Sequence, residues 1–253
     1  MDEPDPDECG VQHDALAQLY RSAGVQVDYV QPSSLPPPNQ LFVADLFVMT
    51  PEGAILGRPA SRIRAGEERW AARALSDLGV PILRSIRGEG TFEGADLMWL
   101  APDTALLGLG LRTNRAGATQ VQHTLREMGV RTVLTDLPPG TMHLMGQLRI
   151  VDRDLAVAWP GRLGNEAVEA LKNQGFHVAF LPGEAEAVRG SALNFVVLGP
   201  RDIVMPEGNP STQAFYEKLG IACRTVDVAE IGKAAGSIGC MTGVLARESD
   251  PGS

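Results

Sequence analysis

Hydrophobic and polar residues follow a pattern that repeats along the chain about every 48 residues. Five helical segments, each with an apolar stripe, end on a glycine followed by an apolar residue, which is the typical signal of a left-handed residue that closes a helix. A short apolar strand is predicted after each ending. The endings are Gly24-Val25, Gly79-Val80, Gly129-Val130, Gly175-Phe176 and Gly220-Ile221, and the strands are 25–30, 80–86, 130–137, 176–182 and 221–228.

Two strand-like runs precede each of the second to fifth helices, and the residues between them are typical of tight turns. The paired runs are 41–50 with 54–59, 95–102 with 104–110, 145–152 with 155–161, and 192–199 with 202–208. The repeating unit is therefore strand–strand–helix–strand.

Such units cannot bury their apolar faces alone, so the copies are expected to pack around one another. We predict an α/β fold, a five-bladed α/β propeller of ββαβ units with pseudo-fivefold symmetry, in one domain covering residues 1–253. Residues 1–10 and 249–253 are predicted to be tails. The first unit lacks a leading hairpin, and segment 241–248 is the candidate for its closing strand. An open doubly wound sheet is the alternative, but it requires single strands between helices, and the chain has no Gly-rich phosphate loop.

Composition narrows the possible partners. Hydrophobic residues make up 44% of the 253 residues, which is enough for a sizeable core, and the formal net charge is −9. This charge argues against a nucleic-acid partner and favours a small cationic one. No apolar stretch is long enough to span a membrane, and the acidic N-terminus is unlike a secretory signal. The three cysteines form no metal-binding pair, so neither a metal nor a cofactor is predicted, and a reducing cytoplasm is the expected location.

Cys240 is the candidate nucleophile, because it lies in a Gly-rich segment, AAGSIGCMTGVLA, predicted as a loop that enters the last strand. A cysteine considered alone is more often a packing residue. That interpretation is preferred for Cys223, which lies inside a predicted strand, and Cys9 is assigned to the N-terminal tail.

His143 is the candidate acid/base, since it lies in a loop ahead of a strand in a chain with four histidines. The other three lie in helical segments or at a strand start and are read as surface or packing residues. Glu93 and Asp96 flank a Gly-Ala step at a strand start, and without further context they are turn residues.

Asp45 is predicted in the middle of a strand, LFVADLFVM, where a buried carboxylate costs several kcal/mol unless a cation pairs with it. The strand supplies no such cation.

Together these fragments resemble the guanidino-modifying superfamily, and most closely its dimethylargininase branch. The resemblance runs from about Leu41 to Glu248. The matching segments are LFVADLFVMTPEGAILGRPASRIRAGEE, FEGADLMWL, GLGLRTNRAGA, MHLMG and GCMTGVL, of which GLGLRTNRAGA is the most specific.

The resemblance implies a five-bladed propeller that hydrolyses the guanidino group of arginine or a methylated arginine through a covalent thiouronium on Cys240. His143 would be the acid/base and Glu93 would orient it. Asp45 would bind the substrate guanidinium, and Arg112, with Arg64 or Arg62, would bind an α-carboxylate. Asp96 is grouped with the substrate-binding residues as a turn-stabilising carboxylate.

The chain departs from the family pattern in four ways: Ala44 and Ala95 replace motif residues, no acidic residue lies shortly before Cys240, and the usual first strand ahead of the first helix is missing. Two alternative functions remain, an amidinotransferase that passes the amidino group to an amine and a non-catalytic propeller that binds a protein. The expected partner is a small cationic guanidino compound, and a homodimer is left open.

Overall fold

The computed structural model describes residues 3–247 and contains four three-stranded sheets of one repeated design. In each sheet the first two strands form an antiparallel hairpin, and the third returns after a helix to pair in parallel with the second. The strands are β1 (Phe47–Thr50), β2 (Gly53–Leu56), β3 (Ile82–Ser85), β4 (Leu97–Ala101), β5 (Thr104–Leu109), β6 (Arg131–Asp136), β7 (Leu148–Ile150), β8 (Leu155–Ala158), β9 (His177–Phe180), β10 (Val196–Gly199), β11 (Asp202–Pro206) and β12 (Ala222–Val226).

The connecting helices are α2 (Glu68–Asp77), α3 (Arg115–Glu127), α4 (Asn165–Asn173) and α6 (Pro210–Lys218), with a short α5 (Ala185–Arg189) ahead of the last sheet. Four of the five predicted ββαβ units are thus confirmed. The open doubly wound alternative is wrong, because the strands form four separate sheets.

Three buried apolar clusters lie between consecutive units. Ile55 of the first unit packs with Leu107 and Val121 of the second. In the same way, Val157 of the third unit packs with Phe195 of the fourth. A unit therefore completes its core only against its neighbour, as the repeat predicted.

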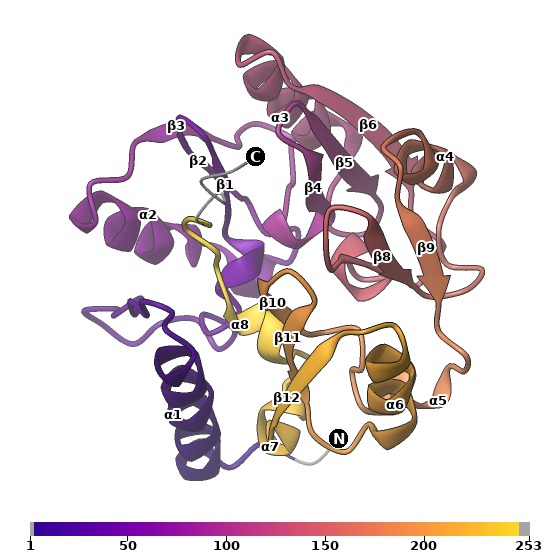
Figure 1. Ribbon diagram of the computed structural model, residues 1–253. Coiled ribbons are helices and arrows are strands. Elements are labelled where there is room, and N and C mark those ends of the chain that lie inside the picture. Colours follow the sequence, from indigo (N-terminus) through magenta and orange to yellow (C-terminus); the bar gives the residue numbers. More distant parts are fainter. Residues whose placement is uncertain (1–2, 248–253) are drawn as a thin grey trace.

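Short helices ahead of the leading strands meet in the middle of the molecule. The 3₁₀ helices η1 (Val43–Asp45), η3 (Gly94–Asp96) and η4 (Leu144–Gly146) contact one another in that order, and α8 (Ile238–Met241) contacts η1. Figure 1 shows α8 near the centre and the longer connecting helices toward the outside. Residues just ahead of each sheet are thereby brought together, although they are far apart in the sequence.

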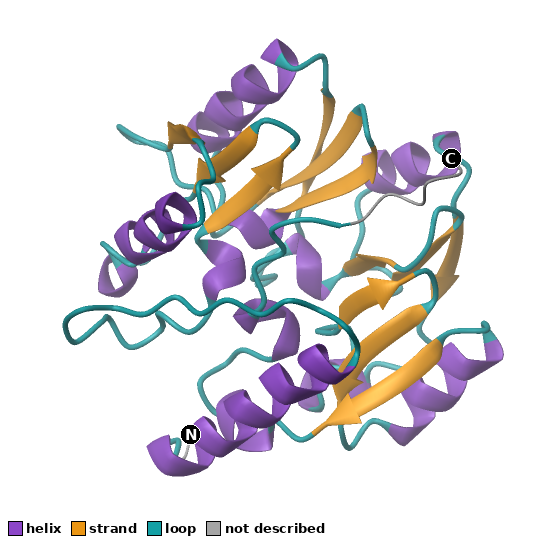
Figure 2. Ribbon diagram, turned by 60° about the vertical axis from the view of Figure 1, so that its left-hand side comes forward, coloured by secondary structure: helices purple, strands orange, loops and turns teal. Residues whose placement is uncertain are grey.

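The fifth sector contains helices where a fifth sheet was predicted. Helix α1 (Pro6–Ser22) packs on α7 (Ala229–Gly232) and on β12. Figure 2 shows α1 at the bottom of the molecule, beside the sheet that contains β12. Within residues 3–247, neither 25–30 nor 242–247 forms a strand, so both strand predictions are wrong there. No leading hairpin offers an edge to 25–30, and its Tyr29 packs instead against His13 and Arg21 of α1.

The predicted N-terminal tail is also wrong from residue 6 onward, because those residues begin α1. Asp5 caps the helix by accepting a hydrogen bond from the backbone N–H of Asp7 at 2.9 Å, and Pro6 occupies the first turn. The backbone N–H of Asp5 donates to Glu230 at 2.7 Å, which ties the helix start to α7. Cys9 therefore lies in a helix. The predicted tail 249–253 lies outside the described residues.

No helix between residues 3 and 247 has the length and apolar composition needed to cross a bilayer.

Gln12 provides a test of how α1 is held. Its buried side chain accepts hydrogen bonds from the backbone N–H groups of Glu230 and Ile231 at 3.0 and 3.2 Å and donates to Asp227. Gln12→Ala would leave these N–H groups without an acceptor, so we expect a loss of about 1–3 kcal/mol in the free energy of unfolding. Urea denaturation measures it. The control is Gln18→Ala on the exposed side of the same helix, and equal stabilities of the two variants would contradict this role.

Candidate active site

The predicted polar residues lie in the turns that enter the sheets. Asp45 ends η1, directly ahead of the first sheet, so its predicted place in mid-strand is wrong. Glu93 immediately precedes η3, and His143 immediately precedes η4 as the loop prediction stated. All three side chains are buried, with relative exposures of 3%, 0% and 6% respectively. The contacts among η1, η3 and η4 bring them into one cluster.

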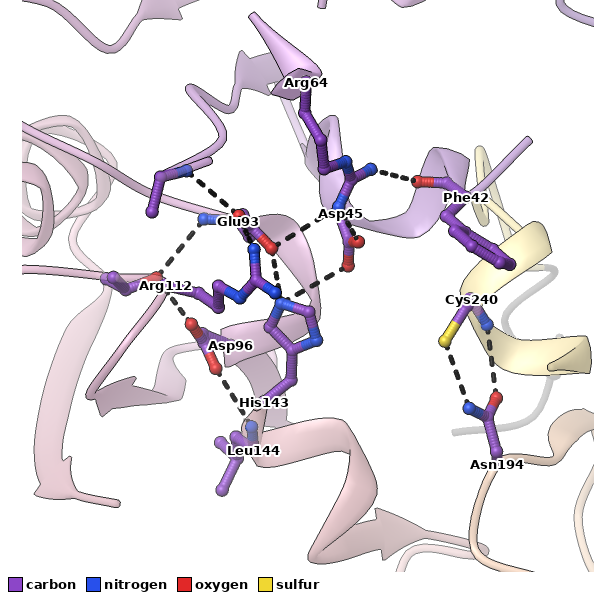
Figure 3. Close-up of polar contacts among 12 residues, drawn as sticks. Phe42, Asp45, Arg64, Glu93, Asp96, Arg112, His143, Leu144, Asn194 and Cys240 are labelled. Atoms are coloured by element: carbon purple, nitrogen blue, oxygen red, sulfur yellow. Dashed lines mark hydrogen bonds and ion pairs between the residues drawn. The ribbon is translucent and has the colours of Figure 1, made fainter. Parts of the chain in front are cut away.

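His143 is held by two carboxylates. Its Nε2 lies 2.6 Å from Glu93 Oε2 and 3.6 Å from Asp45 Oδ1 (Figure 3). Glu93 Oε1 in turn accepts a hydrogen bond from the backbone N–H of Ala60 at 3.0 Å. The imidazole therefore has a fixed orientation, as an acid/base requires.

The charges of this cluster change the pKa of both partners. Burial alone would lower the pKa of His143, but the charge of Asp45 and the hydrogen bond to Glu93 raise it above its ordinary value. Burial alone would raise the pKa of Glu93, but the hydrogen bond and charge of His143 lower it. The pair is therefore stabilised as imidazolium and carboxylate.

Arg64 is an internal cation of the cluster. Its Nη1 lies 2.6 Å from Asp45 Oδ2, its Nε donates to Glu67 at 2.9 Å, and its Nη2 donates to the carbonyl of Phe42. The residue is 4% exposed. Glu67 and Asp45 raise the pKa of this guanidinium, although burial opposes them. Its donors are used within the protein, whereas Arg62, at the start of the same short turn, is exposed.

Arg112 and Asp96 flank the His143 cluster. Arg112 Nη1 lies 3.6 Å from Glu93 Oε1, and its side chain is 23% exposed. The fully buried Asp96 accepts hydrogen bonds from Thr113 at 2.6 Å and from the backbone N–H of Leu144 at 2.9 Å. Burial raises the pKa of Asp96 to about 6. Its contact with Leu144 fixes the residue next to His143.

Cys240 approaches from the C-terminal segment. It lies in α8, so its predicted place in a loop entering a strand is wrong. The residue is half-buried. Its sulfur accepts a hydrogen bond from Asn194 Nδ2 at 3.1 Å, and its backbone N–H donates to Asn194 Oδ1 at 3.2 Å (Figure 3). Burial and the charge of Asp45 raise the pKa of this thiol, while Asn194 and Arg149 oppose the rise. The negative charge of Asp45 thus raises the pKa of both Cys240 and His143.

Asn194 is the residue of this site that the sequence prediction missed. The signal for it was its place in the repeat: it precedes its sheet in ALNFVVLG as Asp45 precedes the first sheet in VADLFVM.

The acidic oxygens and the ring nitrogen of Asp45, Glu93 and His143 all lie within 4.8 Å of one another, a spacing that could hold a metal ion. The charge balance argues against this, because Arg64 Nη1 already lies 2.6 and 3.6 Å from the two carboxylates. A divalent cation there would be repelled by that guanidinium.

The chain is similar in sequence to known proteins over most of its length. The N(G),N(G)-dimethylarginine dimethylaminohydrolase of Pseudomonas aeruginosa is 26% identical over 242 residues, which cover 96% of this chain and 90% of that protein. An arginine deiminase of Rhodococcus erythropolis is 25% identical over 252 residues, covering 84% of this chain and 61% of that protein.

Solved structures share the fold. A dimethylarginine dimethylaminohydrolase in an adduct with S-methyl-L-thiocitrulline has a TM-score of 0.80 at 26% identity, over 94% of this chain and 89% of that one. The N-terminal domain of ArgZ, a cyanobacterial arginine dihydrolase, has a TM-score of 0.84 at 18% identity, over 95% of this chain and 87% of that one. The family model for arginine deiminase matches residues 32–173 and 162–247. The chain therefore belongs to the arginine deiminase family, within the guanidino-modifying superfamily that its motifs resemble.

Proposed function

We propose that this protein hydrolyses the guanidino group of arginine or a methylated arginine, giving citrulline and ammonia or an amine. The observation that carries the proposal is the position of Asp45. Its charge acts on both Cys240 and His143, and its buried Oδ1 accepts no hydrogen bond within residues 3–247. A substrate guanidinium held at this oxygen would pair with Asp45 and lie between the nucleophile and the acid.

The relatives support this chemistry. One solved structure of the Pseudomonas aeruginosa enzyme is a complex with citrulline, and the ArgZ domain is described as covalently bound to a reaction intermediate. For this chain we correspondingly propose hydrolysis of a C–N bond in a linear amidine. The reaction would pass through a covalent intermediate and give a ureido product. The helical fifth sector would then be the counterpart of a fifth blade.

Substrate binding would prepare the nucleophile. In the free protein, burial and Asp45 hold Cys240 as a thiol. A bound guanidinium would offset the charge of Asp45, so the pKa of Cys240 would fall and a thiolate would form. The thiolate would then attack the guanidinium carbon to give a tetrahedral adduct.

His143 would serve both halves of the reaction. As the imidazolium, it would protonate the departing amine and leave a thiouronium on Cys240. The resulting neutral imidazole would then deprotonate a water molecule that attacks the same carbon, and departure of the thiolate would release the ureido product. Glu93 would keep the ring oriented through both steps.

Recognition of an α-carboxylate would involve Arg112 and Arg62. Arg112 is partly exposed beside Glu93, and Arg62 is exposed on the turn that carries Arg64. Arg64 itself is bonded to Asp45 and Glu67, so its role would be to hold Asp45 in place. Of the two arginines of this turn, Arg62 is therefore the one proposed to bind the carboxylate.

The first test is of the nucleophile. Cys240→Ser should reduce formation of ureido product from arginine and methylated arginines by more than about a thousandfold, because a serine hydroxyl is not ionised at neutral pH. Cys223→Ser is the matched control, since Cys223 lies in β12 against the apolar core of the fourth unit. Mass spectrometry should place a trapped adduct on the peptide containing Cys240. An adduct on Cys223, or an active Cys240→Ser variant, would contradict the mechanism.

The pH dependence tests the His143–Glu93 pair. The hydrogen bond and charge of Glu93 help to raise the pKa of His143. Glu93→Gln removes that charge, so His143 would lose its proton at a lower pH. The alkaline limb of the kcat/KM profile, which requires the imidazolium, should therefore move to lower pH by about one unit. A limb that stays in place, or moves to higher pH, would contradict this assignment.

Arg112 tests the class of substrate. Truncating a cation that pairs with a substrate carboxylate typically costs about 2–5 kcal/mol, so Arg112→Ala should raise the KM for arginine-like amino acids well over tenfold. Simple alkylguanidines, which lack the carboxylate, should be affected little. Arg115→Ala, at the exposed start of α3, is the control. If the unmodified protein turned over arginine and agmatine with equal kcat/KM, the α-carboxylate would not contribute to substrate binding, and the proposed role of Arg112 would be wrong.

A further inference from the structure

The four units carry a polar residue at one equivalent backbone position, just ahead of the leading strand. The backbone N–H at this position donates to the carbonyl three residues earlier in every unit, and a buried apolar residue follows it. The four residues are Asp45, Asp96, Gln147 and Asn194. The repeat therefore places one polar residue per unit at the same point of the backbone, and all four are at least partly buried.

Two of these positions already serve the site. Asp45 lies beside His143, and Asp96 fixes the backbone next to it. In the fourth unit the same position brings Asn194 to Cys240, on the side of the site away from His143 (Figure 3).

Asn194 holds the cysteine at two atoms. Its amide N–H donates to Cys240 Sγ at 3.1 Å, while its amide oxygen accepts from the N–H of Cys240 at 3.2 Å. Its own carbonyl also accepts from the N–H of Gly239 at 3.3 Å. These contacts fix both the backbone and the sulfur of the residue, and a hydrogen-bond donor at sulfur favours the thiolate over the thiol.

We infer that Asn194 is the residue that positions the Cys240 sulfur and stabilises its thiolate. The inference rests on the proposed function, in which Cys240 is the nucleophile. It assigns the fourth unit a part in catalysis, alongside Asp45 of the first, Glu93 of the second and His143 of the third.

Gly239 is the complementary feature on α8. A Cβ at this residue would lie 2.7 Å from Asn194 Oδ1, closer than two such atoms can approach. Glycine therefore leaves the room in which the amide reaches Cys240. The charged groups that act on the sulfur from neighbouring elements are Asp45 of η1 and Arg149 of β7, and neither is altered by a change at 194 or 239.

Three variants separate this role from simple packing. Asn194→Asp keeps the shape and the acceptor for the Cys240 N–H but replaces the donor at sulfur with a carboxylate. Asn194→Ala removes both contacts. Gly239→Ala leaves Asn194 and Cys240 chemically intact and pushes them apart. Asn165→Asp places the same new carboxylate on an exposed residue at the start of α4 and is the control.

The measurement is the rate at which iodoacetamide alkylates the Cys240 peptide as a function of pH, followed by mass spectrometry without substrate. We expect Asn194→Asp to move the midpoint of this profile up by about one pH unit or more. In turnover of arginine, kcat should fall by about a hundredfold or more, with KM within about threefold of the parent. Gly239→Ala should also raise the midpoint of the alkylation profile and lower kcat. Asn165→Asp should change neither the midpoint nor kcat.

The results distinguish this inference from the proposed function. If Cys240→Ser remains active, the proposed function fails, whatever Asn194 does. If Cys240 is required but the folded Asn194 and Gly239 variants keep the parent midpoint and kcat within about threefold, only the inference is overturned. A loss confined to KM or to the melting temperature would also overturn it, because that is the result expected of a residue that merely packs α8.

Discussion

The centre of this molecule depends on the neutralisation of buried carboxylates. Asp45, Glu67 and Glu93 are each at most 3% exposed, and a carboxylate in such a place is unstable unless a cation and hydrogen bonds accompany it. Arg64 supplies one cation, bonded to Asp45 and Glu67, and the imidazolium of His143 supplies the other. Because each cation contacts more than one acid, losing one of them would destabilise the whole group.

The charges of this group of buried residues are not balanced. Three carboxylates face two buried cations, and Arg112, partly exposed at 3.6 Å from Glu93, screens only the outer side. Asp45 Oδ1 and Glu67 Oε1 accept no hydrogen bond in residues 3–247. Of these two oxygens, Asp45 Oδ1 is the one beside His143, 3.6 Å from its Nε2. A cationic guanidino group would neutralise the remaining negative charge. The same positive charge would offset that of Asp45 and so lower the pKa of the Cys240 thiol. Binding and activation of the nucleophile would therefore be one electrostatic event.

The repeat explains how residues so far apart in the sequence come together. Each sheet is entered through the same turn, with a hydrogen bond from one residue back to the third before it. The turns of the first three sheets contact one another in sequence, and α8 contacts both the first turn and the fourth. Polar residues in and just ahead of these turns can thus form one site without taking part in the sheets. The fifth sector is the exception, because α1 and α7 pack there through Gln12 and Glu230 instead of forming a sheet.

Local sequence patterns determined the four ββαβ units, since glycine helix ends, turn residues and apolar runs act over a few neighbours. They also drew attention to polar residues in otherwise apolar or turn segments, and the resemblance to a known family assigned these residues to one site. The residues are Cys240, His143, Glu93 and Asp45. Tertiary structure alone decided the rest. Within residues 3–247, the strands expected at 25–30 and 241–248 did not form, because a strand needs a partner edge, which the local sequence does not reveal. Likewise, nothing near Arg64 or Asn194 in the sequence indicates that one is bonded to Asp45 and the other to Cys240, because these contacts join segments 19 and 46 residues apart.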